Sequence, residues 1–327
     1  MRTSHAARLL VASLVLAGSL IGVARADSFP SQPIRLVVGF PPGGINDIVA
    51  RVVGQKLGEA LGQQVVVDNR AGAGGTIGAD LVAKAAPDGY TLLLGSVSNV
   101  AMAPSQYKSL PYMPTKDFAP VALLAAAPNV LVVNPGFEVT SVKELIALAK
   151  KKPGEIAYAS AGNGTSNHLT VELLKVLAGI DLVHVPYKGD NPAVTDVLGG
   201  QVPMVFPTLP VALPHIKTGK LRAIAVSSAR RSTLMPDLPT VAESGGLPEF
   251  EVSVWVGILA PVGTPKSIVE RLNTELNKIV SLPETRDKLA SLGAEPATMG
   301  VEEFAVYIRS ETEKWSKVAR SANIIPN

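Results

Sequence analysis

Short apolar, β-branched segments alternate with amphipathic helical segments along most of this chain. The apolar residues of the short segments are consecutive, which is typical of strands covered on both faces. Strands that are connected through helices pair in parallel. The sequence therefore predicts an α/β fold built on mixed, mostly parallel sheets flanked by helices. The expected strands are Ile34–Gly39, Gln64–Val67, Thr91–Gly95, Val121–Ala126, Val130–Val133, Ile156–Ser160, Leu182–Val185, Met204–Phe206, Arg222–Ser227 and Val252–Leu259.

The expected helices carry recognisable end signals. Within residues 45–61 the apolar side chains recur on one face, and Gly62 follows where a helix end favours a left-handed residue. Thr264 is expected as the N-cap of a later helix and Pro265 as its first residue. Residues 302–319 form the expected last helix.

Two loops are candidate joints between lobes, one around residues 127–129 and the other around residues 247–249. They divide the mature chain into residues 27–127, an inserted segment 128–251 and a return segment 252–327. A chain that crosses twice between two lobes is typical of hinged receptors, whose ligands bind between the lobes. We therefore expect the functional site where these segments meet.

The first 26 residues have the composition of a secretory signal peptide. Arg2 and Arg8 precede an uninterrupted run of 16 small and apolar residues, and an A-x-A sequence ends at Ala26. A membrane anchor is the alternative, but the run is shorter than the roughly 20 residues that cross a bilayer. We expect cleavage after Ala26 and a mature protein in the periplasm.

The formal net charge of +3 resides in this first segment. The segment contains three arginines and no acidic residue, so 27 basic residues face 27 acidic ones in the remainder. A neutral chain without a stripe of basic and aromatic residues gives no indication of a nucleic-acid partner. The absence of cysteine excludes disulfides, thiolate metal sites and a cysteine nucleophile.

Two turns between a strand and a helix have the composition of anion sites. Residues 40–44 read Phe-Pro-Pro-Gly-Gly, and residues 160–168 read Ser-Ala-Gly-Asn-Gly-Thr-Ser-Asn-His. Glycine lets backbone N–H groups approach a ligand, and a helix start adds unpaired donors and a partial positive charge. A carboxylate or phosphate fits such a turn without a lysine or arginine. In the alternative, each turn is an ordinary one with a helix-capping side chain: Asn46 or Asp47 in the first, Thr165 or Ser166 in the second.

A third glycine-rich turn, residues 69–78, does not fit a dinucleotide site. Its spacing is G-x-G-G-x-x-G, and it follows the second expected strand rather than the first. The acidic residue that follows it, Asp88, opens a turn instead of ending a strand. The phosphate-binding sequence G-x-x-x-x-G-K-[ST] is also absent, so no cofactor is expected. A polar loop formed by Ser96, Ser98 and Asn99 is expected at the same sheet edge as the first turn.

The sequence offers no convincing catalytic or metal-binding group. His168, His184 and His215 lack the i, i+4 spacing of metal-binding histidines, so no metal site is expected. Ser166, which precedes His168 by two residues, lacks the G-x-S-x-G sequence of a nucleophile elbow. We therefore expect no enzymatic activity; the alternative is an exported α/β hydrolase that uses this pair.

Eight motifs stand in the order found in a known receptor family. They are FPPGGINDIVAR (40–51), VVVDNRAGAGGTIGAD (65–80), PDGYTLLLGS (87–96), SAGNGTSNHL (160–169), VPYKGDNPAVTDVLGGQV (185–202), GKLRAIAVSSARR (219–231), LPTVAESG (238–245) and APVGTP (260–265). Through these motifs the chain resembles the Bug-type periplasmic solute-binding receptors of tripartite tricarboxylate transporters, over residues 30–320.

This resemblance implies a two-lobe, Venus-flytrap receptor with the class II periplasmic-binding-protein topology. Such receptors pass small organic carboxylates to a membrane permease, and some instead report the ligand to the sensor kinase of a two-component system. The implied ligand is a dicarboxylate or tricarboxylate, an amino acid or an aromatic acid, and the receptor is expected to be a monomer. The positions that match the family's pocket are Phe40, Pro41, Pro42, Gly43, Gly44, Asp47, Ser96, Ser98, Asn99, Ala161, Gly162, Asn163, Gly164, Thr165, Ser166, His168, Tyr187 and Asp190.

Asp190 departs from the family's pattern, in which small or neutral residues are common at this position. An unpaired carboxylate in the pocket would repel a second ligand carboxylate. This favours a ligand that combines one carboxylate with an amine, hydroxyl or aromatic group. The alternative is that Asp190 caps a helix starting near Pro192 or pairs with Lys188.

Overall fold

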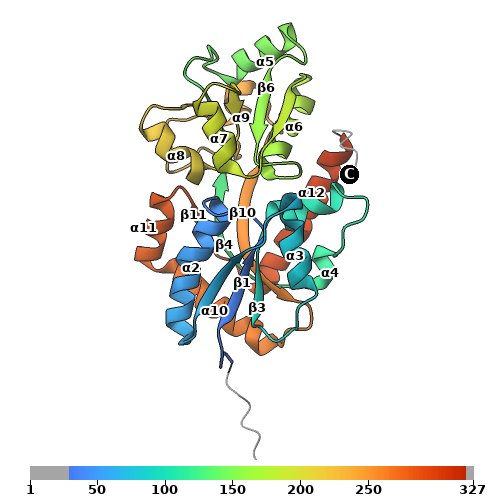
Figure 1. Cartoon of the computed structure of the whole chain (residues 1–327), viewed down its shortest axis with the longest axis vertical. Coiled ribbons are helices and arrows are strands. Elements are labelled where there is room, and N and C mark those ends of the chain that lie inside the picture. Colours follow the sequence, from blue (N-terminus) through green and yellow to red (C-terminus); the bar gives the residue numbers. More distant parts are fainter. Residues whose placement is uncertain (1–28, 322–327) are drawn as a thin grey trace, which may run out of the picture. The chain divides into compact units, whose positions relative to one another are not determined.

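Two β-sheets organise the part of the chain that the computed structural model describes, residues 29–321 (Figure 1). Both sheets belong to one compact unit, Gln32–Asn327. The expected signal peptide and its cleavage site lie outside the described residues. No helix within residues 29–321 is both long and apolar enough to cross a membrane.

The larger sheet has six strands in the order β11-β4-β10-β3-β1-β2. Strand β1 pairs in parallel with β2 and β3, whereas β10 runs antiparallel to β3 and β4. Four of the five side chains of β1 are buried, as expected for a strand covered on both faces. The strands are β1 (Ile34–Val38), β2 (Val65–Asn69), β3 (Thr91–Ser96), β4 (Phe118–Pro128), β10 (Ser253–Pro261) and β11 (Glu295–Pro296).

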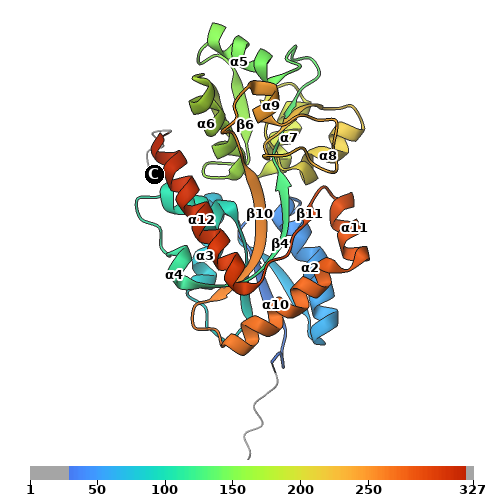
Figure 2. The ribbon, with the colours of Figure 1, turned by 180° about the vertical axis from the view of Figure 1, so that it is seen from behind.

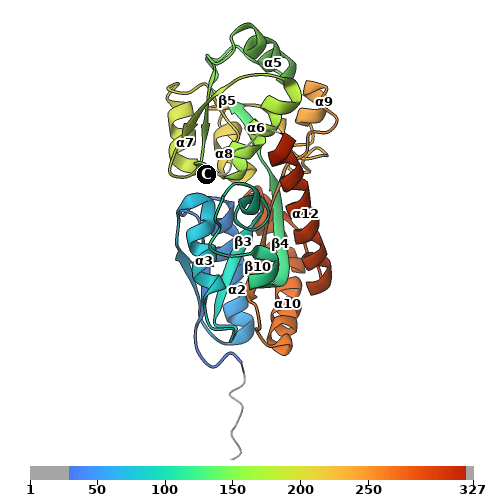
Figure 3. The ribbon, with the colours of Figure 1, turned by 90° about the vertical axis from the view of Figure 1, so that its right-hand side faces the viewer.

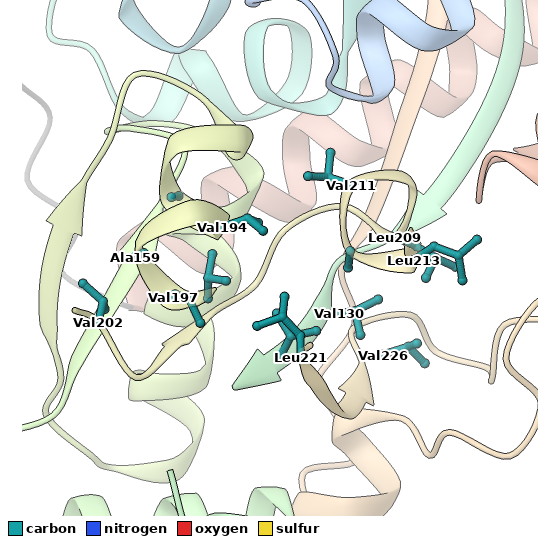
Figure 4. Packing of buried hydrophobic residues seen from close by; sticks show 14 residues of the cluster. Val130, Ala159, Val194, Val197, Val202, Leu209, Val211, Leu213, Leu221 and Val226 are labelled. Atoms are coloured by element: carbon teal, nitrogen blue, oxygen red, sulfur yellow. The ribbon is translucent and has the colours of Figure 1, made fainter. Parts of the chain in front are cut away.

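The smaller sheet has five strands in the order β7-β6-β8-β5-β9. Its core is a cluster of valine, leucine and alanine side chains from the strands and from helices α7 (Asp190–Leu198) and α8 (Leu209–Lys217), among them Val130 and Val197 (Figure 4). The strands are β5 (Val130–Val133), β6 (Ala157–Ser160), β7 (Val183–Pro186), β8 (Met204–Val205) and β9 (Arg222–Val226). Strand β6 is parallel to β7 and β8, and β5 is antiparallel to β8 and β9.

Helices connect the strands of both sheets. Helix α2 (Ile45–Leu61) has the predicted bounds, and Gly62 after it is left-handed with φ of 69°. The prediction for the helix after β10 is wrong by one residue: Pro265 is its N-cap, and the Thr264 hydroxyl donates instead to the Pro261 carbonyl at 2.7 Å. The other helical segments are η1 (Ala73–Gly75), α3 (Thr76–Ala83), η2 (Val97–Met102), η3 (Ala103–Ser105), α4 (Pro114–Asp117), α5 (Val142–Lys151), α6 (Ser166–Ala178), α9 (Val241–Gly245), α10 (Lys266–Ser281), α11 (Pro283–Ser291) and α12 (Val301–Ser321).

The last helix, α12, packs against β4 of the larger sheet and against η2 (Figure 2). Trp255 of β10 and Trp315 of α12 are both buried, and their ring N–H groups donate to Glu311 Oε2 at 3.3 and 3.4 Å. The two tryptophans therefore belong to the core of the larger sheet.

The chain passes from one sheet to the other at Asn129 and returns at Val252, directly before β10. Figure 3 shows β4 and β10 running from the larger sheet toward the smaller one. Strands β4 and β5 are separated by Asn129 alone, although they belong to different sheets. Ser227 Oγ accepts the Asn129 N–H at 2.9 Å and donates to the Val252 carbonyl at 2.6 Å. The outgoing and returning segments are therefore hydrogen-bonded side by side.

Candidate functional site

Loops from both sheets surround a cavity of about 100 Å³. Several of these loops follow the carboxyl ends of β1, β3 and β6, the edge at which parallel strands usually present a ligand site. The larger sheet contributes Phe40, Pro41, Pro42, Gly44, Ile45, Asn46, Ser98 and Val254, and the smaller sheet contributes Ala161, Thr165, Ser166, Asn167, Lys188, Gly189, Asp190, Asn191, Pro192 and Thr208.

Four helices begin at this cavity without a side-chain cap. Helices α2, α6, α7 and α8 follow Gly44, Thr165, Gly189 and Thr208, and all four residues line the cavity. No N-cap side chain accepts a capping hydrogen bond at these starts, so the alternative of a cap by Thr165 is wrong for α6. At α2 the Asp47 side chain does accept the N–H of Gly43, just before the helix. The first N–H groups of a helix have no partner within it, and they carry a partial positive charge. The cavity is therefore surrounded by donors suited to an anion.

Asp47 supports the first loop from behind and is not among the residues that line the cavity. Its Oδ2 accepts the Gly43 N–H at 3.1 Å and Arg51 Nε at 3.0 Å, and its Oδ1 accepts Asn69 Nδ2 at 3.1 Å. Burial alone would raise the pKa of Asp47, but the hydrogen bonds from Arg51, Gly43 and Asn69 outweigh it and hold the pKa below its usual value. Asp47 thus fixes the shape of the turn that brings Gly44 to the cavity.

The loops of the two sheets touch directly across the cavity. The Ser166 N–H donates to Ser98 Oγ at 3.1 Å, and Gln106 Nε2 donates to the Gly164 carbonyl at 3.3 Å. Gly43 has φ of +89°, and a Cβ placed there would lie 2.7 Å from Asn191 Nδ2. A larger residue at position 43 would therefore have to adopt a left-handed conformation and displace the Asn191 side chain at the start of α7.

Two buried polar atoms in the cavity wall lack a partner. Asn46 is 7% exposed and Thr208 is 2% exposed, and neither Asn46 Oδ1 nor Thr208 Oγ1 has a hydrogen-bond partner among the described residues. A buried polar atom that is left unpaired costs about 1–3 kcal/mol. Two such atoms in one small cavity indicate that a polar ligand completes their hydrogen bonds.

Asp190 is the first residue of α7 and lines the cavity. Its Oδ1 accepts Asn167 Nδ2 at 2.8 Å, while no described residue donates to its Oδ2. Neither alternative for Asp190 holds, because the N-cap of α7 is Gly189 and no described ion pair joins Asp190 to Lys188. Burial raises the pKa of Asp190 to about 6, and the hydrogen bond from Asn167 offsets only part of this effect.

The remaining predicted residues fall into two groups. Gly162, Asn163 and Tyr187 line a neighbouring cavity rather than this one. Gly43, Ser96, Asn99, Gly164 and His168, like Asp47, line neither cavity but support the loops that do. The Ser96 N–H donates to Asn99 Oδ1 at 2.8 Å, for example, and Asn99 Nδ2 donates to the Gly75 carbonyl at 3.3 Å.

His168 belongs to a buried cluster behind the second turn. Its ring stacks on His184 at 4.2 Å, and the Gly164 N–H donates to its Nδ1 at 3.4 Å. Burial lowers the pKa of both histidines, and that of His184 falls to about 4. The pair is therefore neutral at neutral pH and supports the turn by packing.

Several cavity residues are absent from the sequence-based prediction. Thr208 has the clearest signal, because a threonine followed by Leu209 and Pro210 is typical of a helix start. The others carry no comparable signal: Ile45, Asn46, Asn167, Lys188, Gly189, Asn191, Pro192 and Val254.

The described residues do not assemble a recognisable catalytic or metal centre. Among residues 29–321 no group of three or more histidine, aspartate or glutamate side chains could hold a metal ion. A serine–histidine pair exists, with Ser160 Oγ 2.6 Å from His184 Nε2. Ser160 is fully buried, so this pair offers a substrate no access to the hydroxyl.

Comparison with known proteins places this site in a family. Residues 49–324 match the family described as Tripartite tricarboxylate transporter family receptor. Protein BugT of Bordetella pertussis is 43% identical over 296 residues, which cover 90% of this chain and 90% of BugT. The structure of R. palustris Rpa4515 with adipate is 37% identical, covers 91% of this chain and 100% of Rpa4515, and has a TM-score of 0.87.

The fold is also that of a solved periplasmic binding protein. The periplasmic binding protein BugD is 36% identical to this chain. The structural match covers 91% of this chain and 100% of BugD, with a TM-score of 0.85. This confirms the expected two-lobe periplasmic-binding-protein fold. With a family match over most of its length, the chain belongs to the receptors of the tripartite tricarboxylate transporter family.

Proposed function

We propose that this receptor binds a small organic carboxylate in the cavity where α2, α6, α7 and α8 begin, and that it delivers the ligand to a tripartite tricarboxylate transporter permease. One observation carries the proposal: four uncapped helix starts and two buried, unpartnered oxygens, on Asn46 and Thr208, surround one cavity. Helix starts bind anions through their free N–H groups. The adipate in Rpa4515 supports a carboxylate as that anion.

The acceptors in the cavity narrow the chemistry of the ligand. The Thr208 hydroxyl can donate to a carboxylate oxygen, whereas Asn46 Oδ1 and Asp190 Oδ2 accept hydrogen bonds. A ligand that carries a hydroxyl or amine beside its carboxylate would satisfy both acceptors. Comparing Asp190→Ala with the parent by calorimetry, over dicarboxylates and amino acids, tests this role. An unchanged ligand preference would contradict it.

A hinge between lobes follows from the two crossings of the chain. We divide the mature chain into one lobe of residues 27–127 and 252–327 and another of residues 128–251. The crossing segments around Asn129 and Val252 are the natural hinge, because they are short and the Ser227 hydroxyl bonds to both. Closure of the lobes would bring the loops of the two sheets together on a bound ligand.

The receptor would act in the periplasm as a monomer, after removal of residues 1–26. Its partner is either the membrane permease of the transporter or, as the alternative, a sensor kinase that reads the ligand-bound form. The expected cleavage after Ala26 is checked by sequencing the N-terminus of the exported protein.

Thr208→Val is the variant that tests the carboxylate site. A thermal-shift screen of carboxylates with the parent comes first, since a ligand at 100 times its Kd adds about 2.7 kcal/mol of stability. Thr208→Val should then lower the affinity for the selected ligand about ten- to hundredfold, as expected for the loss of one hydrogen bond to a charged group. Thr115→Val, at an exposed position in α4, is the matched control. If no carboxylate stabilises the parent, or if both variants bind it equally well, the proposal is wrong.

A further inference from the structure

A second cavity, of about 550 Å³, lies directly beside the first. We call it the outer cavity and the 100 Å³ cavity the inner one. The outer cavity is rimmed by the exposed residues Ala71, Asn163 and Lys188. Both cavities share Phe40, Pro41, Ala161, Thr165, Lys188 and Gly189, so a ligand can extend from one into the other.

The inner cavity is too small for more than the head of a ligand. A buried cavity of about 150 Å³ accommodates one benzene molecule, and the inner cavity has about 100 Å³. A carboxylate with one or two further carbons fills that space. The outer cavity has several times this volume. Any larger acid that places its carboxylate on the helix starts must therefore place its remaining atoms in the outer cavity.

The lining of the outer cavity is mostly apolar in character. The Tyr107 hydroxyl already donates to the Ala73 carbonyl at 2.7 Å, and the Tyr187 hydroxyl donates to Asp196 Oδ2 at 2.6 Å. With their polar ends bonded to the protein, both tyrosines offer the cavity their rings. Gly75 has φ of +92°, and a Cβ placed there would lie 2.7 Å from the Phe40 ring. Glycine at this position therefore lets the ring of Phe40, which lines the outer cavity, pack directly against the turn.

We infer that the ligand is an elongated acid, whose carboxylate head occupies the inner cavity and whose apolar or aromatic body occupies the outer cavity. This inference rests on the proposed function of the inner cavity. It also assigns a role to the glycine-rich turn at residues 69–78, whose spacing does not fit a dinucleotide: residues 71–75 form one wall of the outer cavity. The class is that of acids with about six carbons or one aromatic ring beyond a small head.

Lys188 adds a limited preference for a second negative charge. Among the described residues that line the two cavities, Lys188 and Asp190 alone carry charged side chains. Lys188 is exposed, and no described ion pair involves it. Because exposed ion pairs are weak, a distal carboxylate near Lys188 should gain no more than about fivefold in affinity. The apolar body therefore contributes more to selectivity than the distal charge.

A chain-length series tests the inference with the parent protein alone. Calorimetry with acetate, butanoate, hexanoate and 3-phenylpropanoate should show affinity rising by about fourfold for each methylene that enters the outer cavity. Adipate should bind no more than about fivefold more tightly than hexanoate, and Lys188→Met should remove that difference.

Ala71→Trp provides the second, independent measurement, because it fills the outer cavity and leaves the inner one intact. This variant should bind hexanoate and 3-phenylpropanoate at least about tenfold more weakly than the parent, and its affinity for acetate should be unchanged. The control is Ala86→Trp, at an exposed alanine before the amino end of β3. It should leave the affinity for all three acids unchanged. Equal binding of short and long acids, or an equal loss for all acids in Ala71→Trp, overturns the inference and leaves the proposed function standing. If no acid binds the parent, the proposed function itself fails.

Discussion

Replacing Asp190 by asparagine should make the ligand-free receptor more stable, with the full gain reached only at neutral or alkaline pH. Burial raises the pKa of Asp190 from an ordinary 3.8 to about 6. At about 1.4 kcal/mol per unit, ionised Asp190 destabilises the folded state by about 3 kcal/mol. Asp190 lies at the start of α7, where the helix dipole favours a negative charge. This interaction reduces the destabilisation by about 0.5 kcal/mol. Asparagine keeps the bond from Asn167 and removes the charge, so a gain of about 2–3 kcal/mol is expected above pH 7.

The direction of the pH dependence makes this prediction easy to refute. Below pH 3.8 the carboxyl is protonated in both the folded and the unfolded chain, so parent and variant should be equally stable. Between 3.8 and about 6 the folded chain holds a proton that the unfolded chain has released, and the advantage of the variant grows as the pH rises. Urea unfolding of parent and Asp190→Asn at pH 4, 5, 6, 7 and 8 measures it. Asp237→Asn, at an exposed turn, is the control. A difference that does not change with pH, or one that falls as the pH rises, refutes the reasoning.

Three further predictions concern the hinge, the histidine cluster and the first turn. Ser227→Ala removes the acceptor of the buried Asn129 N–H and should lower the free energy of unfolding by about 1–3 kcal/mol, measured by urea unfolding. His184 has a pKa of about 4 in the folded chain and about 6.5 in the unfolded chain, so its contribution to stability is complete above pH 6.5 and is lost toward pH 4. His184→Gln should flatten this loss in unfolding experiments. Gly43→Val should abolish ligand binding in calorimetry, whereas Gly62→Val, equally left-handed but with no atom within 4 Å, should reduce stability only.

Most of the fold could be predicted from the sequence because its strands are buried runs of apolar residues. All ten predicted strands are present, and most coincide with buried residues. The exceptions are β2 and β7, which lie at the edges of their sheets and expose Val66 and Val183. Strand β11 is missing from the prediction because it consists of Glu295 and Pro296 alone, which form no apolar pattern. Capping signals in the sequence located helix ends to within one residue. Which of Thr264 and Pro265 is the N-cap of α10 could not be predicted, because it depends on the hydrogen bond from the Thr264 hydroxyl to the Pro261 carbonyl.

The candidate site was predictable only where it is local in sequence. The turns at residues 40–44 and 161–166 directly follow strands that end at one edge, so their position follows from the strand order. Thr208 escapes prediction because β8 is two residues long and α8 contains an internal proline. The bond from Ser166 to Ser98 joins residues 68 positions apart and depends on how the two sheets meet. No local pattern records such a contact.

The inner cavity gathers features that each reduce the stability of the folded chain. Unpartnered oxygens on Asn46 and Thr208 cost about 1–3 kcal/mol each, and the ionised Asp190 adds a similar amount. A packing defect would leave an apolar void, whereas both oxygens belong to residues that line one small cavity beside the starts of four helices. A chain that is neutral without its first 26 residues has no net charge with which to attract an anion. It must instead concentrate helix starts and unsatisfied polar groups at one point, so a ligand that satisfies them should also stabilise the fold.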